Sequence, residues 1–164
     1  MYYVAVIPES IPEIESIRAD IDPLVELSKA HITLVFPHQW ESLNDAIKHI
    51  ENIAANVSPF SVVARDFTGQ DGDLIFLNIK KGNDELIELH DMLYSGPFQS
   101  QLDRKQTYIP HITVGRVTNP FAWQENIEAL TELNNSISFD VTSMSVLEIT
   151  QSGDELIRDI ELSG

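Results

Sequence analysis

Two copies of one tetrapeptide pattern carry the residues best suited to chemistry, one copy in each half of the chain: His31-Ile32-Thr33-Leu34 and His111-Ile112-Thr113-Val114. Side chains alternate between faces along a strand, so each copy places its His and Thr on one face and its two apolar residues on the other. Imidazoles can act as base and acid near neutral pH, and hydroxyls can donate hydrogen bonds to phosphate oxygens. Brought into one cleft, these four side chains would suit acid–base chemistry on a phosphate ester.

The flanking sequence predicts that each copy lies on a strand followed by a helix. The first half predicts a strand over 2–7, a helix opened by the capping box Ser10-Ile11-Pro12-Glu13, a motif strand over 31–36 that Pro37 ends, and a helix from Ser42. Two β-rich runs, 60–67 and 74–79, are joined by the turn residues 68–73 and predict a hairpin.

The second half approximately echoes this order. It predicts a helix from Asn83, an irregular polar segment over 98–110, a motif strand over 109–117, a helix that begins at Asn119-Pro120 and includes Leu133, and strands over 137–142, 144–150 and 155–162. The repeated order predicts two similar lobes sharing one compact domain, residues 1–164.

Composition sets the class of protein. Of the 164 residues, 43% are hydrophobic and 22% are charged, which is typical of a soluble globular domain. The absence of cysteine excludes thiol catalysis, disulfides and thiolate metal sites. The first nine residues lack a basic segment and carry only a short apolar run, so we expect no signal peptide, no membrane span and a cytoplasmic location.

The charge balance bears on the binding partner. The chain has 26 acidic and 10 basic residues, a net charge of −16, and would repel long polyanions and anionic membranes. Four of the ten basic residues lie near the motifs in sequence: Lys29, Arg104, Lys105 and Arg116. We therefore expect a positive cleft that binds a small phosphorylated molecule or an RNA terminus rather than a long duplex. The alternative is that the acidic residues serve solubility and the basic ones are merely solvated; the oligomeric state is not indicated.

The residues around both motifs resemble a known family. Ala30-His31-Ile32-Thr33-Leu34-Val35-Phe36-Pro37 and Ile109-Pro110-His111-Ile112-Thr113-Val114-Gly115-Arg116 look like the two signature strands of the 2H phosphoesterases, which include 2′-5′ RNA ligase-like proteins and cyclic nucleotide phosphodiesterases. The resemblance covers nearly the whole chain. It implies a bilobal α+β fold with an antiparallel sheet in each lobe and an active-site groove between the lobes.

The resemblance also implies residue roles. His31 and His111 would be the catalytic pair, and Thr33 and Thr113 would hold the phosphate. Ala30 departs from the proline that many members have before the histidine, which changes no chemical group. The alternative from the residues alone is that both His–Thr pairs are polar groups on solvent-facing strand surfaces.

Further residues near the motifs are candidates for substrate binding. Strict alternation would turn Arg116 away from the cleft, and Gly115 can mark a bulge that re-aims it. Tyr108, at the end of the irregular segment, is the better candidate for stacking on a nucleobase. For Phe36 we expect core packing.

The other three histidines carry no repeated motif. We expect surface or interface positions for His49 and His90, while His38 lies near the mouth of the proposed cleft. No His-x-x-x-His or Glu-x-x-His spacing supports a metal site, so we expect no metal and no cofactor.

The leading hypothesis is a metal-independent phosphoesterase acting on a 2′,3′-cyclic phosphate at an RNA end or on a small cyclic nucleotide. RNA end joining to a 2′-5′ linkage would use the same groups in reverse. The competing class is a non-catalytic nucleotide-binding protein.

Overall fold

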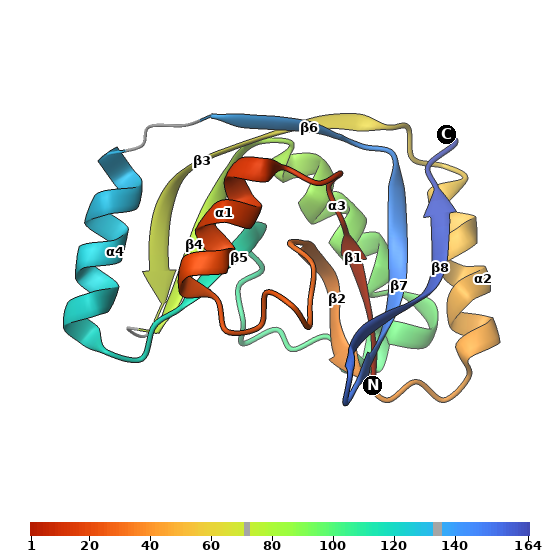
Figure 1. Cartoon of the computed structure of the whole chain (residues 1–164). Helices are drawn as coiled ribbons and strands as arrows, with labels where there is room; N and C mark the ends of the chain where they lie inside the picture. Colours follow the sequence, from red (N-terminus) through yellow and green to blue (C-terminus); the bar gives the residue numbers. More distant parts are fainter. Residues whose placement is uncertain (71–72, 133–135) are drawn as a thin grey trace.

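The two motif strands lie at the facing edges of two four-stranded antiparallel sheets (Figure 1). The structure is a computed structural model that describes residues 1–70, 73–132 and 136–164. The strand order is β2-β1-β7-β8 in one sheet and β5-β4-β3-β6 in the other. The strands are β1 (Tyr2–Val6), β2 (Ile32–His38), β3 (Phe60–Gln70), β4 (Leu74–Lys81), β5 (His111–Arg116), β6 (Ile137–Val141), β7 (Ser143–Thr150) and β8 (Gly153–Glu161).

The lobes are not the two halves of the chain. One sheet combines β1 and β2 with the last strands, β7 and β8, while the other is built from the middle of the chain. The edge strands β2 and β5 contact each other, and this contact brings the two motifs together. The predicted α+β fold with two lobes is confirmed.

The helices connect the lobes as well as covering them. They are α1 (Pro12–Ile21), α2 (Leu43–Ala54), α3 (Asn83–Leu93), the short 3₁₀ helix η1 (Gly96–Gln101) and α4 (Pro120–Glu132). Helix α1, which follows β1, contacts β5 of the other sheet, and α3, which follows β4, contacts β2. Helices α2 and α4 lie at opposite ends of the molecule (Figure 1). No helix in the described part of the chain is long and apolar enough to cross a membrane.

Alternation along the motif strands separates core from site. Ile32 and Leu34 are fully buried on β2, as are Ile112 and Val114 on β5. The histidine and threonine of each motif are only partly buried. One cluster of buried apolar side chains includes residues from both sheets and from all four α-helices. Burial of the apolar face therefore fixes the direction of both His–Thr pairs.

Two predicted boundaries near the first motif are wrong. Helix α1 begins after Ile11, not Ser10, and no side chain caps it. Pro12 stands at the first helical position, where its fixed φ suits the helix and its missing N–H leaves no donor unpaired. Strand β2 continues through Pro37 to His38. It is an edge strand, where a missing backbone donor costs no ladder hydrogen bond.

Other predicted boundaries are confirmed. The Ser42 hydroxyl accepts a hydrogen bond from the Asp45 backbone N–H (3.3 Å) at the start of α2, and the Asn119 side chain accepts from the Phe121 N–H (3.0 Å) at the start of α4. The hairpin is β3–β4, and η1 occupies the start of the segment expected to be irregular. The predicted turn residues Asp71 and Gly72 and the helix position Leu133 lie outside the described residues.

Candidate functional site

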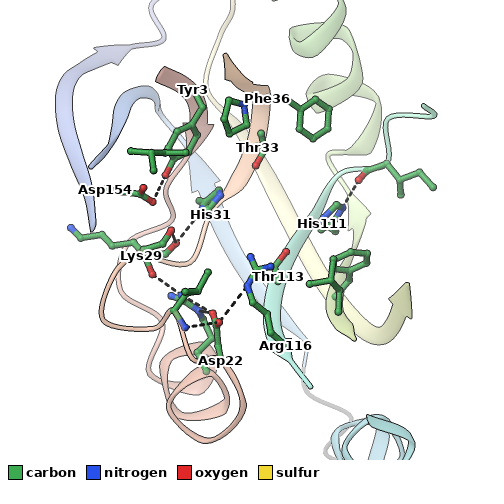
Figure 2. Close-up of a pocket in the computed structure, with 18 of the residues that line it drawn as sticks. Tyr3, Asp22, Lys29, His31, Thr33, Phe36, His111, Thr113, Arg116 and Asp154 are labelled. Atoms are coloured by element: carbon green, nitrogen blue, oxygen red, sulfur yellow. Dashed lines mark hydrogen bonds and ion pairs between the residues drawn. The ribbon is translucent and has the colours of Figure 1, made fainter. Parts of the chain in front are cut away.

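A cleft of about 1030 Å³ lies between the two motif strands. All four motif side chains, His31, Thr33, His111 and Thr113, line it (Figure 2). Thr33 lies on β2 and His31 directly before it, while His111 and Thr113 lie on β5; these two edge strands contact each other. The structure therefore brings together the two His–Thr pairs that are 80 positions apart in the sequence.

Both imidazoles are held by the same kind of hydrogen bond. Nδ1 of His31 lies 2.8 Å from the carbonyl oxygen of Lys29, and Nδ1 of His111 lies 2.7 Å from that of Ile109. A carbonyl oxygen only accepts, so Nδ1 carries the proton in both rings. The second nitrogen, Nε2, is thus left as a base in the neutral ring and as an acid in the protonated ring.

Aromatic neighbours bury the two imidazoles. The Tyr3 ring centroid lies 5.4 Å from that of His31, and the Phe76 centroid lies 3.9 Å from that of His111. Burial lowers the pKa of both histidines below the usual 6.5, and for His31 the nearby His111 lowers it further. Without a bound anion, both rings are therefore neutral at pH 7.

Asp154 distinguishes the two histidines. Its Oδ2 accepts a hydrogen bond from the Tyr3 hydroxyl (2.6 Å), and its charge raises the pKa of His31 against the larger effect of burial. Burial and this carboxylate raise the pKa of the Tyr3 hydroxyl well above its usual value. Tyr3 and Asp154 both line the cleft, yet neither was predicted, because no local motif connects residues 151 positions apart.

The threonine hydroxyls are available to a ligand. Within the described residues, neither Thr33 nor Thr113 uses its hydroxyl in a hydrogen bond. The backbone carbonyl of Thr33 instead accepts from the Tyr108 hydroxyl at 2.8 Å. Because β2 is fixed at this point, the Thr33 hydroxyl is held at the cleft surface with its donor free.

Arg116 lines the cleft because β5 contains a bulge. Ile75 pairs with Gly115 and the next residue, Phe76, pairs with Thr113, so Val114 is the extra residue. The irregularity predicted at Gly115 is present, and it places Arg116 on the same side as the motif polar groups. A Cβ on Gly115 would lie 2.7 Å from Cδ1 of Ile21, so any larger residue there would force the Ile21 side chain to move.

Tyr108 has a different environment from the one expected. Its ring stacks on His90 with centroids 3.8 Å apart and planes at 4°, so one face is already covered. His90 was expected at the surface or an interface, but it is only 4% exposed because α3 packs against β2, and its Nδ1 donates to the Leu34 carbonyl oxygen at 2.8 Å. Phe36 is 39% exposed in the cleft, where core packing was expected. Ala5 pairs with Thr33 and Val4 with Val35, and this register shift puts Val35 on the buried face and Phe36 on the cleft face.

Of the basic residues and the histidine predicted near the cleft, some line it and others do not. Lys29 and Lys105 line the cleft, whereas Arg104 does not. His38 lines a smaller neighbouring pocket of about 210 Å³ rather than the cleft itself.

Arg18, which was not among the predicted site residues, also lines the cleft. Its spacing of four from Asp22 on a predicted helix was the sequence signal that could have indicated this ion pair. Among the described residues, no group of three or more His, Asp or Glu side chains is arranged to hold a metal ion.

Comparison with known proteins shows similarity in sequence pattern and in fold. The sequence pattern of the 2′-5′ RNA ligase superfamily matches residues 7–153. The fold is similar to that of TT0787 of Thermus thermophilus, with a TM-score of 0.65 and 16% identity over 99% of this chain and 98% of that one. It is also similar to the crystal structure of a protein described as a phosphoesterase, with a TM-score of 0.63 and 18% identity over 99% and 98%.

A further similar structure is that of E. coli LigT complexed with 3′-AMP, with a TM-score of 0.61 and 20% identity over 99% of this chain and 98% of that one. At such low identities these likenesses concern the fold. A comparison with curated protein sequences finds no match.

Proposed function

Since the chain belongs to the 2′-5′ RNA ligase superfamily of 2H phosphoesterases, we propose that it hydrolyses a 2′,3′-cyclic phosphate, at an RNA end or on a small nucleotide, without a metal ion. The observation that carries the proposal is the paired geometry of the cleft. Two imidazoles and two free threonine hydroxyls line one cavity, and each imidazole has its Nδ1 proton committed to a backbone carbonyl. Each therefore presents Nε2 for proton transfer.

The proposed reaction uses the two histidines as base and acid. The neutral imidazole takes a proton from water at Nε2 as the water oxygen forms a bond to phosphorus. The protonated imidazole gives its Nε2 proton to the ribose oxygen as the bond from phosphorus to that oxygen breaks. The product is a phosphate monoester, and the histidine that acted as base carries the proton at the end. In the reverse direction the two roles exchange.

The threonines and Arg116 would stabilise the charge on the phosphate. Thr33 and Thr113 reach the cleft from opposite lobes, so their hydroxyls can donate to different non-bridging oxygens. Arg116 adds a positive charge that the bulge in β5 has turned to the same side. Such donors stabilise the transition state most when they are held in place before the substrate binds.

The charges favour a small or terminal substrate. Lys29, Lys105 and Arg116 line the cleft of a protein whose net charge is −16. A long RNA would meet the acidic surface outside the cleft, whereas a single phosphate would meet mainly the basic residues inside it. Crystal structures of E. coli LigT carry NADP⁺, ATP or 3′-AMP, which supports a nucleotide as the ligand of this related fold.

The test is hydrolysis of 2′,3′-cyclic nucleotides in the presence of EDTA. The wild type should turn over the substrate, and the double variant His31→Ala, His111→Ala should not. The control is His49→Gln, since His49 lies on α2 outside the cleft and a glutamine amide can replace its hydrogen bond to the Leu93 carbonyl. Equal turnover by wild type and double variant would refute the proposal. Nucleotide binding without turnover by the wild type would indicate a binding protein, and joining of RNA ends would indicate a ligase.

A further inference from the structure

A buried ion pair at the C-terminal end of α1 lies in the wall of the cleft but outside both motifs. Arg18 is 2% exposed and Asp22 is 5% exposed. The guanidinium donates from Nε and Nη2 to Oδ2 of Asp22, at 3.0 and 2.9 Å. Removing two charges from water costs free energy that their attraction often fails to recover, so a contribution to stability alone is a weak explanation for such a pair.

The pair fixes the loop that leads into the first motif. Nη2 of Arg18 also donates to the carbonyl oxygen of Ser28 at 2.6 Å, and Oδ1 of Asp22 accepts from the Leu24 N–H at 3.1 Å. The residue after Ser28 is Lys29, whose carbonyl accepts the Nδ1 proton of His31. The carbonyl that the guanidinium contacts and the carbonyl that orients this imidazole therefore belong to adjacent peptide units.

The same carboxylate faces the second motif strand. Oδ1 of Asp22 lies 3.7 Å from Nε of Arg116, and Figure 2 shows this contact beside the contact of His31 with Lys29. Helix α1 packs against β5, which carries Arg116, while the loop after α1 leads into β2. The Arg18–Asp22 pair therefore contacts both the loop that leads into β2 and Arg116 on β5.

We propose that Arg18 and Asp22 are positioning residues that couple the two motifs, orienting His31 through the 22–30 loop and holding Arg116 toward the phosphate. The consequence for catalysis rests on the proposed function. The consequence for His31 itself does not, because the tautomer of an imidazole is observable without substrate. The planar, forked guanidinium of Arg18 is essential in this role, since it donates hydrogen bonds to the Asp22 carboxylate and the Ser28 carbonyl at the same time.

The main test is the double variant Arg18→Met, Asp22→Asn. It leaves no lone buried charge, and the oxygen of the introduced amide can still accept from the Leu24 N–H, so the fold should be kept. Nitrogen-15 NMR of the imidazoles should show His31 as a mixture of tautomers. His111, whose acceptor is the Ile109 carbonyl, should stay protonated at Nδ1 and serves as the internal reference. Turnover of a 2′,3′-cyclic nucleotide should fall about 10- to 100-fold in kcat, the cost of a misplaced catalytic group.

A pH titration gives a second signature. His31 senses the charges of Asp154 on β8, Arg18 on α1 and His111 on β5, and the Arg18 charge lowers its pKa. The double variant should therefore titrate His31 at higher pH than the wild type. The variant Arg18→Lys keeps the charge but cannot serve both acceptors with a planar fork, so it should change the tautomer with little change in the titration.

The matched control is Arg158→Met, Glu51→Gln. This ion pair joins β8 to α2 at 3.3 Å and both side chains are exposed, so tautomer, titration and kcat should stay as in the wild type. A wild-type His31 tautomer and kcat in folded Arg18→Lys or in the folded double variant would overturn the inference. If the wild type shows no phosphoesterase activity, the proposed function fails, while the tautomer measurement still decides the positioning role.

Discussion

Replacing Thr33 or Thr113 by Val tests whether the two hydroxyls hold the phosphate in the transition state. Valine keeps the branched shape that suits a strand and removes only the donor. Both threonines are partly buried in the cleft wall, and within the described residues neither hydroxyl has a hydrogen-bond partner. No group of the protein is therefore left unpaired by either substitution, and the free energy of unfolding should change by no more than about 0.5 kcal/mol.

The effect on catalysis should be much larger than the effect on stability. Removing one preorganised donor from a charge-stabilising site costs about 10²-fold in kcat, or about 2.7 kcal/mol of transition-state stabilisation. We expect this loss for each single variant. Because both hydroxyls would contact the same phosphate, the double variant should lose more than about 10²-fold but less than the product of the two single losses, about 10⁴-fold.

The assay is steady-state hydrolysis of a 2′,3′-cyclic nucleotide in EDTA, together with thermal unfolding of each variant. Thr118→Val is the control, since Thr118 is exposed between β5 and α4 and does not line the cleft. It should keep wild-type kcat and KM. Folded Thr33→Val and Thr113→Val variants that retain kcat within about threefold of the wild type would refute phosphate binding by these hydroxyls.

The remaining predictions concern protonation and support of the site. Burial lowers the pKa of both His31 and His111 below 6.5. Because the active state needs one protonated and one neutral ring, kcat/KM should peak below pH 6.5 and fall as the pH rises. An optimum above pH 7 would contradict this prediction. Asp154→Asn removes the charge that raises the pKa of His31, so NMR should show His31 titrating at still lower pH with His111 unchanged. Tyr108→Phe removes the hydrogen bond to the Thr33 carbonyl and should lower the free energy of unfolding by about 1 kcal/mol, seen as a Tm lower by roughly 2–4 °C; an unchanged Tm would show that this contact does not stabilise the fold.

The sequence predicted those features that depend on local pattern. Alternation set the polar face of each motif, because burial of Ile32 and Leu34 on β2 leaves no other orientation for the His and Thr beside them. Turn and cap chemistry located most helices and strands, as at Ser42 and Asn119. The predicted end of the first motif strand at Pro37 was wrong because β2 lies at the edge of its sheet, where a strand tolerates proline.

The site beyond the motifs could not be predicted in the same way. Phe36 was expected in the core and His90 at the surface or an interface. The register shift in β2 turns Phe36 toward the cleft, and the packing of α3 on β2 buries His90. Residue type gives the tendency to be buried, but the neighbouring element decides whether a given side chain is covered. The side of β5 on which Arg116 lies depends on the extra residue in that strand, and Gly115 indicated only that such a bulge was possible.

By itself the sequence determined that the chain carries two equivalent His–Thr pairs on strands, because strand periodicity is a property of the local backbone. Only the tertiary structure decided that these pairs share one cleft, because β1 and β2 join the last two strands in one sheet while the other motif lies on the edge of the second. The contact of Tyr3 with Asp154, the hydrogen bond of Tyr108 to the Thr33 carbonyl and the approach of Asp22 to Arg116 are likewise set by how segments meet in space. Hydrogen bonds and ion pairs act over a few ångströms, so residues far apart in the chain acquire them only after the fold has brought their elements together.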